Sequence, residues 1–120
     1  MSRAHRLGAA GERLAARYLA ARGYEILAHN LRDGRNEVDL VARTGRTVAF
    51  VEVKTRAGPE YGHPLEAITP TKQREIARVA AGWIRRFGRP GDAYRFDAVA
   101  IIWDGSGRPD VEHVPDAWRR

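Results

Sequence analysis

The pattern of apolar and polar positions predicts two amphipathic helices. In the first, over residues 4–21, apolar side chains recur at steps of three and four residues, and Gly23 follows where the helix is expected to end. The second begins after the capping residue Thr69, has Pro70 in its first turn and runs to about Phe87. Its apolar stripe is expected to be buried and consists of Ile76, Val79, Ala80, Trp83 and Phe87.

Short strand-type runs separated by turn signals occupy much of the chain between the helices. Three of them precede the irregular loop "TRAGPEYGHPLEAIT", and they are residues 24–30, 37–43 and 47–54. The turns between them are marked by Asp33-Gly34 and by "TGR".

After the second helix, residues 94–103 form a fourth, largely apolar strand, and "VEHV" is a candidate edge strand before a polar tail. The order α-β-β-β-α-β predicts an α/β fold with a mixed central sheet flanked by helices. The length suits one domain over residues 1–120, with its core at about residues 4–103 and a C-terminal strand or tail over 104–120.

Acidic and basic side chains interrupt the second and third strands in a regular way. Glu37 and Asp39 are expected on one face of their strand, with Val38 and Leu40 on the other. Glu52 and Lys54 share a face of the next strand, and a short turn makes the two strands hairpin neighbours, so that Asp39 and Glu52 can approach each other.

Two adjacent carboxylates repel unless a cation lies between them, and such oxygen ligands suit Mg²⁺ or Mn²⁺. A lysine beside them, Lys54, can orient or deprotonate a water molecule, or stabilise charge on a phosphate. The alternative is a solvated sheet face on which Lys54 forms ion pairs with Glu52 and Asp39.

Each helix adds one polar residue close to its apolar stripe. Glu12 lies on the flank of the first stripe, where a metal site or an ion pair would compensate its burial, unless it simply reaches water. Gln73 lies one turn before Ile76 on the second stripe, although a glutamine in a first turn can instead serve as a capping-box residue that reaches back toward Thr69.

The charge of the chain favours an anionic partner, with nucleic acid first. The formal net charge is +6 and the pI is about 10.5. Of the 21 basic residues only Lys54 and Lys72 are lysine, which indicates sites where a compact charge with an adjustable pKa is useful. The absence of cysteine excludes a disulfide framework and a thiolate zinc site. No segment resembles a membrane span or a secretory signal, so a cytoplasmic location without membrane association is expected.

Five blocks of the chain, taken in order, resemble a family of small bacterial proteins, the YraN-like family. The blocks are "GERLAARYLAARGYEILAHN", "NEVDLVAR", "VAFVEVKTR", "TPTKQREIARVAAGWI" and "RFDAVAI", and they extend from about Gly8 to Ile102. That family resembles the restriction-endonuclease-like PD-(D/E)xK nucleases, and among them the archaeal Holliday junction resolvases. The resemblance implies a nuclease-like fold, a metal-dependent endonuclease of DNA, with branched DNA as one possible substrate, and a possible homodimer.

The resemblance also assigns roles to particular residues. Asp39 and Glu52 match the metal-binding acids, Lys54 the catalytic lysine, and the carbonyl of Val53 a further metal ligand. Glu12 matches a glutamate in the first helix of the resolvase-like branch, and Gln73 matches a helix residue that follows the motif.

Two positions depart from the family pattern. Val38 stands where the motif has proline, and Asn36 stands where the family has glycine, which could alter the turn before Glu37. The basic residues expected to contact phosphates are Arg56, Lys72, Arg85 and Arg86, although the two arginines near the end of the second helix also suit the negative end of its dipole.

Other interpretations remain open from the sequence. Asp97, within an apolar strand, could pair with Arg95 or support the site from behind, and a structural role is favoured. A nucleic-acid-binding protein that keeps the nuclease fold with little catalysis is one alternative function, and a scaffold protein with a structural ion-pair cluster is another.

Overall fold

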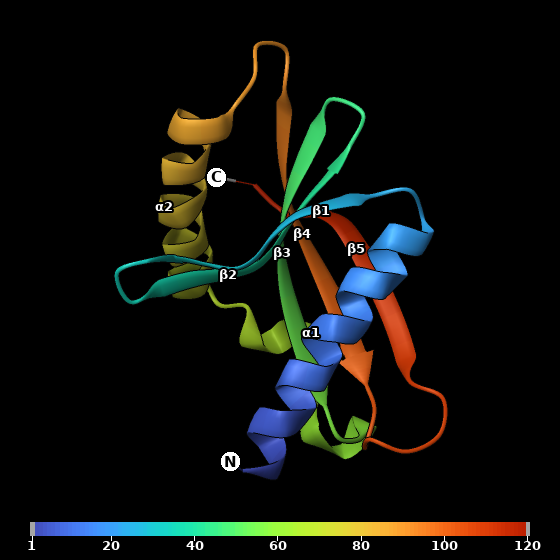
Figure 1. Ribbon diagram of the computed structural model, residues 1–120. Helices are drawn as coiled ribbons and strands as arrows, with labels where there is room; N and C mark the ends of the chain where they lie inside the picture. Colours follow the sequence, from blue (N-terminus) through green and yellow to red (C-terminus); the bar gives the residue numbers. More distant parts are fainter. Residues whose placement is uncertain (1, 120) are drawn as a thin grey trace.

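The computed structural model describes residues 2–119, except for the side chain of Ala4, as helices packed on both faces of one mixed sheet (Figure 1). The elements in chain order are α1 (Arg3–Ala21), β1 (Glu25–Asp33), β2 (Asn36–Thr44), β3 (Thr47–Arg56), the short 3-10 helices η1 (Pro59–Tyr61) and η2 (Pro64–Ala67), α2 (Pro70–Phe87), β4 (Ala93–Ile102) and β5 (Asp110–Trp118). No helix in the described part is long and apolar enough to cross a membrane.

The five strands lie in the sheet in the same order as in the sequence, β1-β2-β3-β4-β5. Neighbouring strands are antiparallel except β3 and β4, which run parallel because α2 carries the chain back across the sheet. The predicted α/β class with a mixed central sheet is therefore confirmed.

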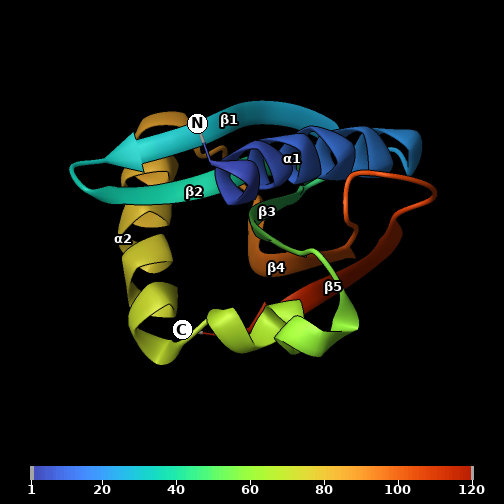
Figure 2. The same ribbon diagram turned by 90° about the horizontal axis from the view of Figure 1, so that it is seen from below.

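The alternation of side chains along β3 places α1 and α2 on opposite faces. Ala49, Val51 and Val53 pack with Leu19 of α1, whereas Val48 and Phe50 pack against α2. The resulting three layers are visible in Figure 2, where α1 crosses one side of the sheet and α2 stands on the other. Gly11 allows the close approach of α1, because a Cβ at this position would overlap the Thr55 hydroxyl of β3.

β2 and β3 separate part of the way along their length. Their paired residues run from Thr44–Thr47 to Leu40–Val51 and stop there, although both strands continue. β2 continues beside β1, and the two strands curve away together across α2 (Figure 1). The sheet is thus forked after Leu40, and the fork opens a space between β2, β3 and α1.

The fork corrects the expectation that Val38 and Leu40 share a face. Val38 packs in the core beneath α2, whereas Leu40 packs in the core beneath α1. Simple alternation fails here because β2 leaves the plane of the sheet between the two residues.

Two further expectations are wrong. The segment after "DGSGRPD" is a nine-residue strand, β5, rather than a short strand and a polar tail. Its last residue, Trp118, stacks on Phe96 of β4, with ring centroids 5.7 Å apart, and this contact anchors the strand. Phe87 does not belong to the buried stripe of α2: it is the last residue of the helix and is 52% exposed.

Candidate metal centre

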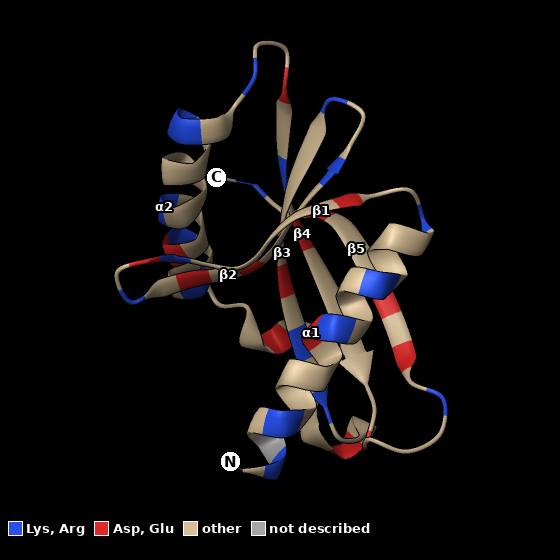
Figure 3. Cartoon of the chain, viewed as in Figure 1, with Lys and Arg blue, Asp and Glu red and all other residues tan. Residues whose placement is uncertain are grey.

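A polar cavity of about 430 Å³ lies at the fork of the sheet. It is lined by residues of α1, the β1–β2 turn, β2, β3 and the first turn of α2, namely Gly8, Glu12, Arg35, Glu37, Asp39, Glu52, Val53, Lys54, Thr55, Arg56 and Lys72. Figure 3 shows acidic segments of β2 and β3 near the point where these strands separate. Four carboxyl groups and two lysines, contributed by α1, β2, β3 and α2, therefore face one space.

Asp39 and Glu52 are the most deeply buried acids of the cavity, with 8% and 1% of their surface exposed. The Asp39 carboxylate accepts a hydrogen bond of 2.7 Å from the main-chain N–H of Val53. The main-chain pairing of β2 with β3 ends before this residue, so the N–H has no main-chain acceptor in β2. Burial, together with a hydrogen bond to Glu52 and its nearby negative charge, raises the pKa of Asp39 to about 8. This shift favours the protonated form of Asp39 near neutral pH in the metal-free protein.

Glu12 and Glu37 complete a second acidic group around Asp39. Single carboxylate oxygens of these three residues lie within 4.8 Å of one another. The side-chain amide of Asn30 joins the two glutamates, donating to Glu12 over 3.1 Å and to Glu37 over 2.9 Å. Burial raises the pKa of Glu12, with the negative charge of Asp39 adding to the effect and the hydrogen bond from Asn30 opposing it.

Asn30 holds this bridge with an unusual backbone. It lies within β1 at φ 48°, in the left-handed region that asparagine tolerates better than most residues. Its β1 neighbours pair on either side of Asp39, His29 with Leu40 and Leu31 with Val38, so that Asn30 lies where β2 leaves the sheet. The irregularity turns the amide toward the acids.

The cations around the cavity differ in whether they form an ion pair with one of its acids. Lys72 forms an ion pair of 3.4 Å with the buried Oε2 of Glu52, and Arg32 forms one of 3.0 Å with Glu37 at the surface. Lys54 lies in the cavity near Asp39, and within the described residues its ammonium makes no hydrogen bond or ion pair. Lys54 is thus the lysine of the cavity that is available to a bound group.

The donor set fits a hard divalent cation. Carboxylate oxygens from three elements and the main-chain carbonyl of Val53 are the ligand types that Mg²⁺ and Mn²⁺ prefer. Burial and the neighbouring carboxylate of Glu52 raise the pKa of Asp39, and a cation bound between the two acids would favour the ionised form of Asp39.

Most of the site residues expected from the sequence line this cavity. The structure brings together Glu12, Asp39, Glu52, Val53, Lys54, Arg56 and Lys72. Gln73 is not part of the lining; its side-chain amide donates to the carbonyl of Ile68 over 3.4 Å, a local contact at the start of α2. Arg85 and Arg86 lie in the last turn of α2, at the opposite end of that helix from Lys72.

Three residues of the site, Glu37, Asn30 and Arg35, are not predicted from the sequence. Glu37 is recognisable as a neighbour of Asp39, but the pattern of the strand assigns it no role. Asparagine is depleted in strands, so Asn30 inside a strand-type run is a signal that could have been used.

The other buried acid, Asp97, belongs to a different network. It accepts hydrogen bonds of 2.8 Å from Arg95 and 3.0 Å from the main-chain N–H of Asp116, and its Oδ2 lies 2.8 Å from Nε2 of His113. Burial alone would raise the pKa of Asp97, but the hydrogen bonds from His113 and Arg95 outweigh it and hold the pKa below its usual value. These bonds join β4 to β5 and support the structural role expected for Asp97.

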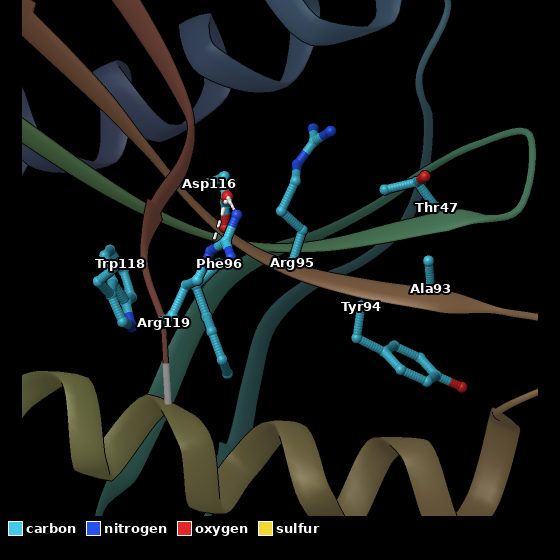
Figure 4. A pocket seen from close by; sticks show the side chains of 8 residues that line it. All are labelled: Thr47, Ala93, Tyr94, Arg95, Phe96, Asp116, Trp118 and Arg119. Atoms are coloured by element: carbon cyan, nitrogen blue, oxygen red, sulfur yellow. Dashed lines mark hydrogen bonds and ion pairs between the residues drawn. The ribbon is translucent and has the colours of Figure 1, made fainter.

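A second cavity, of about 420 Å³, lies near Asp97 between the start of β4 and the end of β5 (Figure 4). The one acid in its lining, Asp116, is paired with Arg119 over 2.7 Å. The guanidinium of Arg95 points away from this pair, as Figure 4 shows, toward its partners Asp97 and Tyr24. This cavity therefore lacks the converging acids found at the fork.

Comparison with known proteins identifies the family. The model of the uncharacterised protein family UPF0102 matches residues 11–101. The chain belongs to this family. The resemblance to the YraN-like family is thereby confirmed, and the matched segment contains every acid and lysine that lines the fork cavity.

Several curated UPF0102 proteins are similar along most of their length. One from Rhodococcus jostii (strain RHA1) is 51% identical over 112 residues, covering 93% of this chain and 95% of the relative. Another from Leifsonia xyli subsp. xyli is 44% identical over 115 residues, covering 96% and 98%. A third, from Chlorobaculum tepidum, is 51% identical over 96 residues, covering 80% and 74%.

Proposed function

We propose that this chain is a divalent-metal-dependent endonuclease that hydrolyses phosphodiester bonds in DNA. The observation that carries the proposal is the fork cavity, in which acids from α1, β2 and β3 converge beside Lys54, whose ammonium makes no hydrogen bond or ion pair with the described residues. Such a site combines hard-cation ligands with a lysine that can act on water or phosphate. The forked mixed sheet between two helices is in keeping with a restriction-endonuclease-like fold.

Asp39, Glu52 and the carbonyl of Val53 are the proposed ligands of Mg²⁺ or Mn²⁺, with Glu12 supporting them. Glu37 is added because its carboxylate lies within 4.8 Å of those of Glu12 and Asp39. When bound, the cation supplies positive charge that polarises the phosphate and makes a bound water more acidic.

The chain contributes proton and phosphate positioning. Lys54 extends from the same strand face as Glu52, so its ammonium is placed to orient the attacking water and to stabilise charge that develops on the phosphate. Asp39 must be ionised before all the acids can act as ligands, and its raised pKa therefore makes metal affinity increase with pH. To position water or phosphate, Gln73 would have to leave its contact with the carbonyl of Ile68.

The basic character of the chain supports a nucleic-acid substrate. The formal net charge is +6 despite the acids of the cavity, and Arg35, Arg56 and Lys72 line the same space. Such residues contact phosphates without reading sequence. We propose DNA as the substrate, with branched DNA and a homodimer as the arrangement suggested by the resolvase-like resemblance.

The ion pair between Lys72 and Glu52 favours one alternative, a structural charge cluster. The melting temperature with and without Mn²⁺ separates the two. A metal site stabilises the fold as it fills, by about 2.7 kcal/mol at a hundredfold excess over Kd, whereas an ion-pair network gains nothing.

Cleavage of a labelled DNA panel tests the activity. Single-stranded, duplex, flap and four-way-junction DNA are incubated with Mg²⁺ or Mn²⁺ and with wild type, Glu52→Gln and Lys54→Met, beside the exposed control Glu60→Gln. Both site variants are expected to lose at least about a hundredfold in rate, while the control keeps wild-type activity. Binding without cleavage by the wild type would favour the alternative of a nucleic-acid-binding protein of nuclease fold.

A further inference from the structure

A second groove begins where the fork cavity ends. It has a volume of about 540 Å³ and is lined by Arg3 and Leu7 of α1, Thr55 and Arg56 at the end of β3, and Ala57 and Tyr61 of the following loop and η1. Thr55 and Arg56 also line the fork cavity, so the two spaces are adjacent. Figure 2 shows the chain after β3 running from beneath α1 to the short helices η1 and η2.

The groove combines an exposed aromatic ring with two cations. Tyr61 is the most exposed of the large apolar or aromatic side chains in the described residues, at 64%. Arg56 makes no side-chain hydrogen bond or ion pair with the part of the chain that the structure describes. Arg3 donates to the main-chain carbonyl of Asp104 over 3.2 Å, which fixes its guanidinium near the groove, and its charge also acts on the Asp104 carboxyl, whose pKa it helps to lower.

Neither feature is explained by the stability of the fold. An exposed tyrosine gains little from burial, and an arginine without an acidic partner contributes no ion pair. The groove contains no acidic side chain among the described residues that line it, in contrast to the fork cavity beside it. Its apolar floor of Leu7 and Ala57 and its positive rim suit a flat, aromatic, negatively charged group, which is the chemistry of a nucleotide.

We propose that this groove is a subsite for one unpaired nucleotide next to the phosphate in the fork cavity, with its base stacked on Tyr61 and its phosphate held by Arg56 and Arg3. This inference rests on the proposed function, and it narrows the substrate to DNA with an unpaired base beside the cleaved bond, such as a flap, an overhang or an open junction. A fully paired duplex cannot present such a base without unstacking it.

The test is a binding measurement without metal, so that it does not depend on cleavage. Two DNAs share the same duplex and carry a single-stranded extension with the same number of phosphates. The extension has its bases in one DNA and is abasic in the other. The pair is tested with the extension at the 5′ end and again with it at the 3′ end. The affinity of wild type for the base-bearing DNA is expected to exceed that for the abasic DNA, and Tyr61→Ala is expected to lower only the former, by roughly 5- to 100-fold. Tyr61→Phe keeps the preference, since it retains the ring.

Two further variants and a fluorescent base separate stacking on Tyr61 from general binding of DNA. Phe87→Ala removes another exposed aromatic ring, at the far end of α2, and leaves both affinities unchanged. Arg56→Gln weakens the binding of both DNAs alike and reduces the dependence of the affinity on salt concentration. A 2-aminopurine at the first unpaired position is quenched on binding to wild type but not to Tyr61→Ala.

Equal affinity of wild type for the two DNAs, or an equal loss for both in Tyr61→Ala, would overturn the subsite. The cleavage panel tests the nuclease separately. Cleavage of a flap that is unchanged in Tyr61→Ala refutes the subsite alone, whereas base-dependent binding without cleavage by wild type refutes only the nuclease.

Discussion

Asp39→Asn is expected to stabilise the metal-free protein while removing a metal ligand. Asparagine keeps the shape of the side chain and an oxygen that can accept the hydrogen bond from Val53, as Asp39 does over 2.7 Å. Its amide can donate to Glu52, as the protonated carboxyl of Asp39 would. The substitution thus reproduces the protonated form without the need to take up a proton.

The magnitude follows from the pKa. The carboxyl has an ordinary pKa of 3.8 in the unfolded chain and about 8 in the folded chain. Each pH unit between the unfolded pKa and the working pH costs about 1.4 kcal/mol of stability, so the penalty at pH 7 is about 4 kcal/mol at most. Because Asn brings its own cost of burial, about 1–3 kcal/mol of net stabilisation is expected, or roughly 4–12 °C in Tm.

The sign of the pH dependence is fixed by the direction of the shift. Since the folded pKa is the higher one, the penalty is absent below about pH 4, grows as the pH rises and levels off near pH 8. The difference in Tm between Asp39→Asn and wild type should therefore be large at pH 7.5 and small at pH 4.5, as measured by thermal unfolding in a chelator. With saturating Mn²⁺ the wild type should gain stability and the variant little.

Asp97→Asn is the matched control, because Asp97 is also a buried aspartate, on the strand next to β3. Its pKa is lowered by hydrogen bonds from His113 and Arg95 against the effect of burial, so its ionised form stabilises the fold above the unfolded pKa and this contribution is lost in acid. Asp97→Asn should destabilise by about 2 kcal/mol or more at pH 7. If Asp39→Asn were destabilising at pH 7, or if its effect did not change with pH, the assignment of a raised pKa to Asp39 would be wrong.

Two other substitutions test the contacts around the site. Lys72→Met should raise the affinity for Mn²⁺ by about 2- to 10-fold, because it frees Glu52 from a competing ion pair; a weaker affinity in calorimetry would make Lys72 a helper of the metal instead. Gly11→Ala should lower Tm, because the added Cβ meets the Thr55 hydroxyl, although alanine alone favours a helix by about 1 kcal/mol. Gly11→Ala introduced into the Thr55→Ala variant should leave Tm unchanged or raise it. An equal decrease in Tm in both backgrounds would exclude this contact as the cause.

Local rules were sufficient for the parts of the fold that obey strand and helix periodicity. The hairpin turn between β2 and β3 fixes their register, and alternation along each strand then places Asp39 beside Glu52. Glu12 was found for a similar reason, since the helical period placed it at the edge of a buried stripe that had to meet the sheet.

The features that escaped prediction depend on how elements meet. The fork cannot be predicted from the pattern of β2, because Val38 and Leu40 look like ordinary alternating positions until β2 turns away from β3. The bridge from Asn30 requires a left-handed residue inside a strand, which no periodicity indicates. β5 contains Pro115 and few apolar residues, so its strand character comes from pairing with β4 and from the contact of Trp118.

The fork and the candidate metal centre have a common origin in Asp39. Where β2 and β3 part, the N–H of Val53 needs an acceptor, and one oxygen of the Asp39 carboxylate supplies it. The same carboxyl lies near Glu52, which together with burial raises its pKa. Opening the sheet therefore creates the cavity and, in the same step, places an acid with a raised pKa inside it. A cation that replaced the proton of Asp39 would reduce the repulsion between the acids and leave the bond to Val53 intact, so metal binding is expected to reinforce the fork rather than rearrange it.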